Sequence, residues 1–177
     1  MNIAKPIANP AVRAMNRTAN ITPDEVVRIY GDDIWRYVSS KLPRQEDAED
    51  VVMEVFGIAC RKIHVIQKVE SPKLWLLAVA RKRVMDCLRK RYRRSEFPLN
   101  EAIEHAAPEE TPTRTQVQNL VAKLPDVQRD AMILKYVNGL ETIEVARIIR
   151  KSPEATNSLL QRAREAMRQW GAEAIHG

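Results

Sequence analysis

The hydrophobic positions of this chain recur at helical spacing in two stretches, separated by a segment without such a repeat. Ahead of the first stretch, Thr22, Pro23 and Glu25 form the pattern of a helix start, with a capping threonine, a proline in the first turn and a glutamate that completes a capping box. The apolar positions that follow recur every four residues, at Val26, Tyr30, Ile34, Val38 and Leu42. This spacing predicts a helix that ends at Pro43 and carries one apolar stripe in need of a partner.

Two further helices are predicted to supply that partner. The segment from about 44 to 64 again has apolar side chains at helical spacing, at Val51, Val52, Val55, Phe56, Ala59 and Ile63. After a short break over 65–70, Ser71 and Pro72 give a second start signal for a long helix that reaches about Arg94. Because three such helices can bury one small core, we expect a first helical domain over residues 22–95.

Two segments lack sustained helical patterning. Residues 1–21, with two prolines and scattered polar residues, are predicted to be a flexible leader. Residues 96–113 contain five Glu, three Pro and neither Lys nor Arg, which predicts an acidic flexible linker. Fully extended, this linker reaches about 60 Å, so the domains that it joins can occupy well-separated sites.

A second helical domain is predicted over residues 114–177. Its first apolar positions at helical spacing are Val117, Leu120, Val121, Leu124, Ala131, Ile133, Leu134 and Val137. An Asn-Gly pair at 138–139 then signals a helix end. A short helix over about 142–149, a turn at 150–151 and a Ser152-Pro153 start to a last helix form a helix-turn-helix pattern.

Composition agrees with an all-α protein of two small helical domains. The chain of 177 residues has only five Gly and 5% aromatic residues, which favours helices over strands. Cys60 and Cys87 lie far apart and no histidine stands at ligand spacing, so we expect two buried reduced thiols and no metal site. The longest apolar run, 74–80, is far short of a membrane span, and residues 1–20 lack the apolar core of a signal peptide. A cytoplasmic protein without membrane insertion is therefore expected.

The net charge of +6 permits binding to nucleic acid or to an anionic membrane. The distribution of the charges along the chain has to distinguish these two possibilities. Within residues 81–94 eight cations stand against the single acid Asp86, and they are Arg81, Lys82, Arg83, Arg89, Lys90, Arg91, Arg93 and Arg94. Cations along one helix bind nucleic acid by releasing counterions, and Trp75, Tyr92 and Phe97 nearby can stack on unpaired bases. We favour a nucleic-acid surface over a merely solvated face, although Trp75 itself fits the core better.

Acidic residues are concentrated one predicted helix earlier, at Glu46, Asp47, Glu49, Asp50 and Glu54. Positions i and i+4 share a helix face, so Glu46, Asp50 and Glu54 form a stripe that suits a basic partner helix. Taken alone, a solvated face is the favoured interpretation of this stripe. A metal site is not favoured, since carboxylates along one helix do not wrap a cation.

The helix-turn-helix pattern over 141–168 is a candidate DNA reader. Its second helix is expected to expose side chains whose donors and acceptors match base edges, namely Thr156, Asn157, Gln161, Arg162 and Arg164. A packing role is an equal alternative on the pattern alone.

Catalysis finds no support, because the chain has no nucleophile beside a plausible histidine in a recognisable motif and no Gly-rich phosphate loop. We expect no enzyme, no catalytic residue and no cofactor.

These stretches together resemble a known family. The segments 47–56 (DAEDVVMEVF), 75–76 (WL), 80–83 (ARKR) and 86–94 match, in order and spacing, region 2 of the extracytoplasmic-function (ECF) sigma factors of the sigma-70 family. Region 4 of that family is resembled at Leu124-Pro125, Gln128-Arg129, Gly139-Leu140, Glu144-Val145-Ala146, Ser152 and Arg162-Ala163-Arg164. The resemblance covers roughly residues 24–170. It implies a sigma factor that binds core RNA polymerase and directs promoter recognition and transcription initiation.

The resemblance implies three sets of contact residues. Docking on core polymerase is assigned to Asp47, Glu49, Asp50, Met53, Glu54 and Phe56. Recognition and opening of the minus-10 promoter element are assigned to His64, Ile66, Lys68, Trp75, Arg81, Lys82, Arg83, Asp86, Arg89, Lys90 and Arg91. Reading of the minus-35 element in the major groove is assigned to Ser152, Thr156, Asn157, Ser158, Gln161, Arg162 and Arg164. The implied partners are core RNA polymerase, promoter DNA and an anti-sigma factor.

The chain departs from the family pattern at several of these positions. Met53 replaces a usual glutamine, Lys82 a common asparagine and Arg150 a frequent glycine in the helix-turn-helix, while 157–159 replaces a more basic sequence. Two alternatives stay open. One is a helix-turn-helix regulator that binds DNA without polymerase, and the other is a degenerate family member that acts only by binding another regulator.

Overall fold

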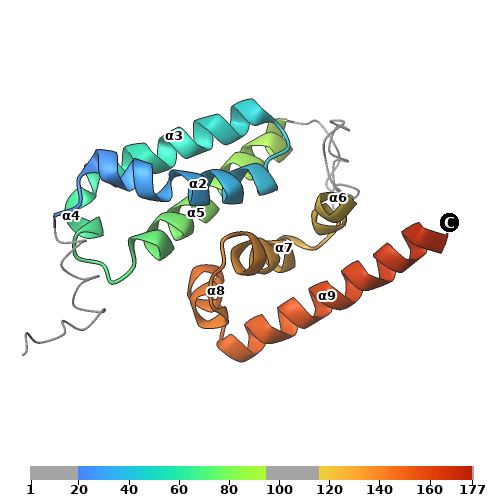
Figure 1. Ribbon diagram of the computed structural model, residues 1–177. Helices are drawn as coiled ribbons and strands as arrows, with labels where there is room; N and C mark the ends of the chain where they lie inside the picture. Colours follow the sequence, from blue (N-terminus) through green and yellow to red (C-terminus); the bar gives the residue numbers. More distant parts are fainter. Residues whose placement is uncertain (1–19, 95–115, 177) are drawn as a thin grey trace, which may run out of the picture.

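The computed structural model describes residues 20–94 and 116–176, and the regular structure within these ranges is helical (Figure 1). The first domain comprises α2 (Pro23–Lys41), α3 (Gln45–Arg61), the short α4 (Ile63–Ile66) and α5 (Pro72–Arg94). The second comprises α6 (Gln116–Ala122), α7 (Asp126–Met132), the π-helical turn η1 (Ile133–Val137), α8 (Thr142–Ile149) and α9 (Pro153–His176). The expected all-α fold with two helical domains is confirmed. The predicted linker and residues 1–19 of the predicted leader lie outside the described residues.

The start of α2 follows the expected capping box. The Thr22 hydroxyl accepts a hydrogen bond from the Glu25 amide at 3.3 Å, and the Thr22 amide donates to the Glu25 carboxylate at 2.9 Å. Order begins before this cap, however. Ile21 is buried in the core and its carbonyl accepts a hydrogen bond from Gln67, so its assignment to a flexible leader was wrong. An apolar side chain just ahead of the cap fixes how the chain enters the helix.

The core of the first domain lies between α2, α3 and α5. The predicted stripe of α2 is largely confirmed, since Val26, Ile34, Val38 and Leu42 are buried while Tyr30 is partly buried. These side chains pack among Val51 and Val55 of α3 and Leu76, Leu77 and Val84 of α5. The helix predicted over about 44–64 ends earlier, at Arg61, and the chain then turns into α4.

The second domain places α7 and α8 against the long α9, while η1 continues α7 and contacts α2 and α8 (Figure 1). In η1 the Asn138 amide donates to the Ile133 carbonyl, five residues back, and the chain then leaves the helix at Gly139, whose φ is +70°. The predicted helix end at this Asn-Gly pair is confirmed. Val137, which the apolar spacing placed on the buried stripe, is 41% exposed, because the wider π turn carries it off that stripe.

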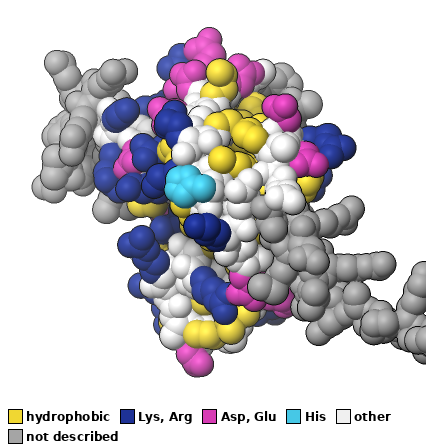
Figure 2. All heavy atoms as spheres, turned by 90° about the vertical axis from the view of Figure 1, so that its left-hand side faces the viewer, with side chains coloured by type: hydrophobic (Ala, Val, Ile, Leu, Met, Phe, Trp, Pro, Cys, Tyr) yellow, Lys and Arg dark blue, Asp and Glu magenta, His cyan; other side chains and the backbone are white. Residues whose placement is uncertain are grey.

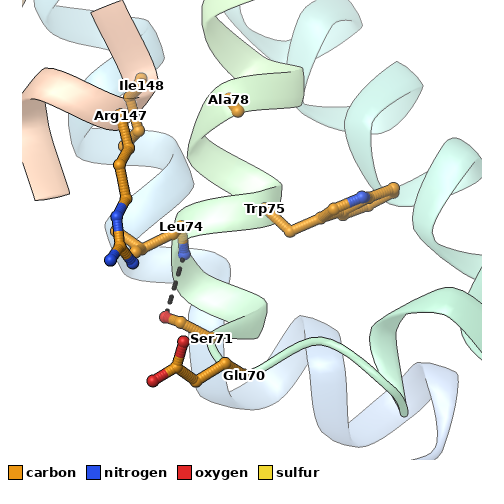
Figure 3. Close-up of a pocket in the computed structure, with 7 residues that line it drawn as sticks. All are labelled: Glu70, Ser71, Leu74, Trp75, Ala78, Arg147 and Ile148. Atoms are coloured by element: carbon orange, nitrogen blue, oxygen red, sulfur yellow. Dashed lines mark hydrogen bonds between the residues drawn. The ribbon is translucent and has the colours of Figure 1, made fainter. Parts of the chain in front are cut away.

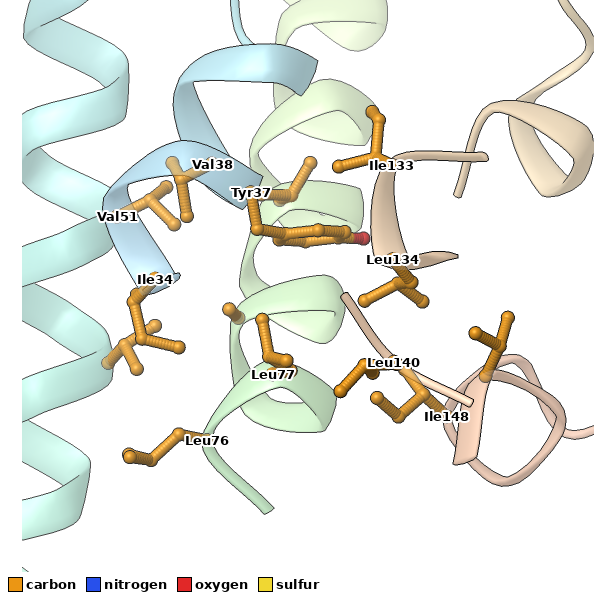
Figure 4. Close-up of a cluster of buried hydrophobic side chains, with 14 of the residues drawn as sticks. Ile34, Tyr37, Val38, Val51, Leu76, Leu77, Ile133, Leu134, Leu140 and Ile148 are labelled. Atoms are coloured by element: carbon orange, nitrogen blue, oxygen red, sulfur yellow. The ribbon is translucent and has the colours of Figure 1, made fainter. Parts of the chain in front are cut away.

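The two domains share one hydrophobic core. Figure 4 shows the Tyr37 ring of α2 lying between α5 and the segment that carries Ile133 and Leu134 of the second domain. Leu77 of α5 and Ile148 of α8 belong to the same buried cluster. The domains are therefore packed directly against each other, and this packing decides which charged side chains of α2 and α5 reach solvent.

Candidate functional site

The acidic helix α3 presents its charge to solvent. Glu46, Glu49, Asp50 and Glu54 are exposed, and Met53 among them is 75% exposed, the highest value among the large apolar side chains that the structure describes. Asp47 lies at the edge of this stripe, where its carboxylate pairs with Arg91 of α5 at 3.4 Å. The stripe together with Met53 is called the acidic face below.

Phe56 does not belong to the acidic face. It is only 9% exposed and packs in the core of the first domain, so its assignment as a polymerase contact is corrected to a packing role. The helical period explains the difference, because Phe56 shares its side of α3 with buried Val55 and Ala59.

The basic helix α5 divides its cations between solvent and carboxylates. Lys82, Arg89 and Lys90 are exposed and form what is called the basic face below. Asp86 lies between Arg83 and Arg89, at 3.7 and 3.4 Å. Arg81, which directly precedes Lys82 in the chain, is directed into the domain interface.

The segment before α5 gives a mixed result. His64 and Lys68 are exposed, as a nucleic-acid contact requires, but Ile66 is fully buried. Its assignment as a minus-10 contact was wrong, because α4 directs this side chain into the core. Figure 2 shows acidic side chains gathered at the top of this end of the molecule, with Lys and Arg along its left side and lower half.

Trp75 lies beside a shallow cavity between the two domains. The cavity holds about 260 Å³ and is lined by Glu70, Ser71, Leu74, Trp75, Ala78, Arg147 and Ile148. Figure 3 shows Arg147 of α8 reaching toward Leu74, while the Trp75 ring extends to the opposite side. Trp75 is partly buried and packs against the core, in agreement with the preference for a core role.

The helix-turn-helix is formed by α8 and α9. The turn passes through Arg150 in the left-handed conformation, with φ +57°, and the amides of Arg150 and Lys151 both donate to the Ala146 carbonyl. The Ser152 hydroxyl then accepts from the Ala155 amide at 3.1 Å and starts α9. Hydrogen bonds from its own backbone amide and from the Ser152 hydroxyl lower the pKa of Glu154 in this first turn.

The expected reading residues of α9 are mostly exposed. Exposed side chains among them are Ser152, Asn157, Ser158, Gln161, Arg162 and Arg164. Thr156 is the exception, since it is fully buried and its hydroxyl donates to the Ser152 carbonyl at 2.9 Å. The expectation that Thr156 is exposed was wrong, because it lies on the side of α9 that holds buried Leu160 and Ala163.

Sequence reasoning missed a charged cluster at the domain interface. Asp130 of α7 is fully buried, and its carboxylate accepts from the Tyr37 hydroxyl at 2.9 Å and pairs with Lys41 at 3.0 Å and Arg81 at 2.7 Å. Burial, followed by the charge of Asp130, raises the pKa of Tyr37 well above its ordinary value. The only signal in the sequence is an acid directly ahead of the apolar run 131–134.

Neither cysteine behaves as a simple core residue. Cys60 is exposed, so the expectation of two buried thiols was wrong for it, while Cys87 is half-buried. Burial, followed by the negative charge of Asp47, raises the pKa of the Cys87 thiol.

The described part of the chain brings together no group of three or more His, Cys, Asp or Glu side chains able to hold a metal ion. Within the same residues, none of the helices has the length and apolar character needed to cross a bilayer.

Comparisons with known proteins match both halves of the chain. The family model of sigma-70 region 2 matches residues 26–94, and that of sigma-70 region 4 matches residues 114–167. The ECF RNA polymerase sigma factor SigM of Bacillus subtilis is 27% identical over 154 residues, covering 84% of this chain and 94% of SigM. The ECF RNA polymerase sigma factor SigW of the same organism is 26% identical over 161 residues, covering 82% and 86%.

A solved structure supports the same fold. The sigma factor RpoE from Bartonella quintana, in complex with the anti-sigma factor NepR, superimposes with a TM-score of 0.67 at 20% identity, covering 81% of this chain and 92% of RpoE.

Proposed function

The chain belongs to the extracytoplasmic-function group of the sigma-70 family and is an RNA polymerase sigma factor. From this premise we propose which of its surfaces makes each contact of transcription initiation. Sigma factors are regulatory proteins without a catalytic role of their own, so each surface is assigned to a binding step. The proposed division follows the domains, with residues 22–95 for polymerase and the minus-10 element, 114–177 for the minus-35 element and 96–113 as the linker.

The acidic face of α3 is proposed to bind core RNA polymerase. The observation that carries this assignment is the exposed Met53 flanked by the exposed carboxylates Asp50 and Glu54. A large apolar side chain at the centre of a charged stripe is the arrangement of an interface, with an apolar contact inside and a polar rim around it. The carboxylates would steer the helix onto a basic partner surface and repel DNA.

The basic face of α5 and the exposed side of α9 are proposed to bind promoter DNA. Lys82, Arg89 and Lys90 supply phosphate contacts, which give affinity and a steep dependence on salt. Gln161 and Arg162 of α9 carry the donors that can match base edges in the major groove. His64 and Lys68, which are both exposed, are proposed to contact an unpaired base after melting.

We further propose an anti-sigma factor as a regulatory partner and the cytoplasm as the location. The sigma factor RpoE of the solved complex is bound to its anti-sigma factor NepR, which supports the first proposal. The second follows from the proposed work on core polymerase and chromosomal promoters. Neither proposal requires a cofactor or an enzymatic activity.

Run-off transcription with core polymerase on a library of genomic fragments tests the proposed function. We expect new start sites with the wild-type protein and their loss with Asp50→Lys, which reverses charge at the centre of the acidic face. The matched control is Asp32→Lys, the same change at an exposed carboxylate of α2, and it should keep the start sites. Specific DNA binding by the protein alone, without new transcripts, would instead identify an independent regulator. If the protein gives neither new transcripts nor specific DNA binding, it acts only by binding another regulator.

A further inference from the structure

The acidic helix α3 and the basic helix α5 are joined by an ion pair near their ends. Nη1 of Arg91, close to the end of α5, lies 3.4 Å from Oδ2 of Asp47 in the first turn of α3. The family resemblance assigned Asp47 to core polymerase and Arg91 to DNA. In the structure these two side chains contact each other, so their roles are linked.

Asp47 is turned away from the acidic face. Its Oδ2 atom is buried and accepts no hydrogen bond from the described residues, so the charge of Arg91 is its electrostatic partner. Only 27% of the Asp47 side chain is exposed, whereas Glu46 and Asp50, before and after it in the chain, are exposed. A buried carboxylate oxygen is costly without an opposite charge beside it. Asp47 therefore offers little surface to a docking protein and directs its buried oxygen to α5.

Arg91 lies on the packed side of α5 and not on its basic face. Val84, seven residues earlier, is fully buried, and Cys87, four residues earlier, packs against the core. Side chains at these spacings share one side of a helix. Arg91 is still 40% exposed, and the ion pair engages only Nη1, so the guanidinium keeps donors for a phosphate. Asp47 thus holds Arg91 without using up its hydrogen-bonding capacity.

The ion pair ties this end of α5 to the rest of the first domain. Arg89 pairs with Asp86 of its own helix, and Lys90 has no ion pair or hydrogen bond within the part of the chain that the structure describes. Among residues 89–91, it is Arg91 that makes a polar contact to another helix. A cation that is held in place before DNA arrives loses less freedom on binding, which favours affinity.

We propose that Asp47 is a positioning residue for promoter binding, which holds Arg91 and the end of α5 in place for DNA and makes no contact with core polymerase. This role rests on the proposed binding of promoter DNA by α5. An acid beside a DNA surface normally repels phosphates, so its removal strengthens binding. Removal of the Asp47 charge should instead weaken binding, because Arg91 loses the partner that holds it.

Three substitutions of the same kind in the full chain test this role. Asp47→Asn breaks the ion pair, Asp50→Asn removes a charge from the acidic face, and Asp32→Asn is the control at an exposed carboxylate of α2. Fluorescence anisotropy gives the affinity of each labelled protein for core polymerase. With core polymerase in excess, it also gives the affinity of the holoenzyme for a labelled promoter duplex with an unpaired central bubble, taken from a start site found by run-off transcription. Circular dichroism shows whether each variant keeps its helices.

Asp47→Asn is expected to weaken binding of the bubble duplex about threefold, the scale of a partly exposed ion pair, and to leave the affinity for core polymerase unchanged. Asp50→Asn should show the opposite pattern, with weaker core binding and unchanged duplex binding. Asp32→Asn should match the wild type in both measurements. In a protein that already carries Arg91→Gln, Asp47→Asn should cause no further weakening, because the interaction that it removes is already absent.

Cys87 reports on the ion pair independently of transcription. Burial raises the pKa of its thiol most, and the negative charges of Asp47 and Glu54 raise it further. The positive charges of Arg91 and Lys90 lower that pKa. The thiol therefore lies close enough to both members of the pair to sense the loss of either charge.

The thiol is titrated in a Cys60→Ser background, which leaves Cys87 as the one cysteine of the chain. Thiolate absorbance as a function of pH gives its pKa. Asp47→Asn should lower the pKa of Cys87, and Arg91→Gln should raise it. An Asp47 side chain that faced solvent and polymerase instead of α5 would leave the first of these values unchanged.

Three outcomes overturn the positioning role. If Asp47→Asn weakens core binding as Asp50→Asn does, Asp47 is a polymerase contact. If Asp47→Asn strengthens duplex binding, Asp47 only neutralises Arg91. If both affinities stay at wild-type values while the pKa of Cys87 falls, the pair exists but serves the structure of the domain alone.

A second variant keeps the test decisive if Asp47→Asn loses its helices. Arg91→Lys keeps the positive charge but shortens the reach to Asp47. Weaker duplex binding with unchanged core binding then supports the positioning role, and unchanged duplex binding overturns it. A wild type that gives no start sites in run-off transcription would refute the proposed function, whereas an unchanged Cys87 pKa in Asp47→Asn refutes the pairing by itself.

Discussion

Replacing Arg150 with glycine should stabilise the protein, although it removes a side chain. Arg150 has φ +57° and ψ +52° at the end of α8, a conformation that costs a residue with a β-carbon about 1–2 kcal/mol. Glycine avoids that cost but adds freedom to the unfolded chain, which returns about 0.5–1 kcal/mol. Because the Arg150 side chain is exposed, little packing is lost, and the net gain should be about 0.5–1 kcal/mol.

Urea unfolding followed by circular dichroism measures this change. Arg150→Ala is the matched control, since it removes the same side chain but keeps the β-carbon and therefore the left-handed penalty. We expect Arg150→Ala to leave the free energy of unfolding nearly unchanged and Arg150→Gly to raise it. If both variants destabilise the protein equally, the arginine side chain contributes a contact that outweighs its backbone conformation, and the reasoning from φ fails.

Three further predictions concern the first domain. Leu77→Ala should lower the free energy of unfolding by about 2–5 kcal/mol in urea, because Leu77 is fully buried in the shared core. Thr22→Ala should lower the thermal midpoint through a loss of about 1 kcal/mol, since the capping box of α2 is removed. Tyr37→Phe should be less stable than the wild type at neutral pH. The difference in free energy of unfolding between the two proteins should narrow as the pH rises above 10. The pKa of Tyr37 is higher in the folded than in the unfolded protein, so its stabilising effect is complete at pH values below the unfolded-state pKa and is lost as the pH rises through the folded-state pKa. Urea titrations of both proteins across that range test this.

The elements that the sequence predicted well are those set by local rules. The start of α2 depends on Thr22 and Glu25, three residues apart, and the end of η1 on the adjacent Asn138 and Gly139. Such signals act within one turn, so they can be recognised in the sequence without knowledge of the fold. The charged side chains of α3 and α9 were placed correctly on exposed faces for the same reason, since helical period alone separates them from the core.

The misplaced residues are those whose position depends on a neighbouring element. Thr156 has a polar side chain suited to base contact, yet it faces the packed side of α9 and satisfies its hydroxyl on the Ser152 carbonyl. Ile66 is buried because the chain turns at α4, which spacing does not reveal. Asp130 and Tyr37 were missed altogether, because each is satisfied by a residue 93 positions away.

That long separation along the chain also orders events during synthesis. Helices α2, α3 and α5 precede α7 in the chain, so they leave the ribosome first and can fold before Asp130 is available to them. A nascent first domain therefore has Lys41 and Arg81 in water, with the surface around Tyr37 uncovered, until α7 arrives. Translation that pauses between α5 and α7 would lengthen this interval, in which the apolar surface around Tyr37 stays open to water.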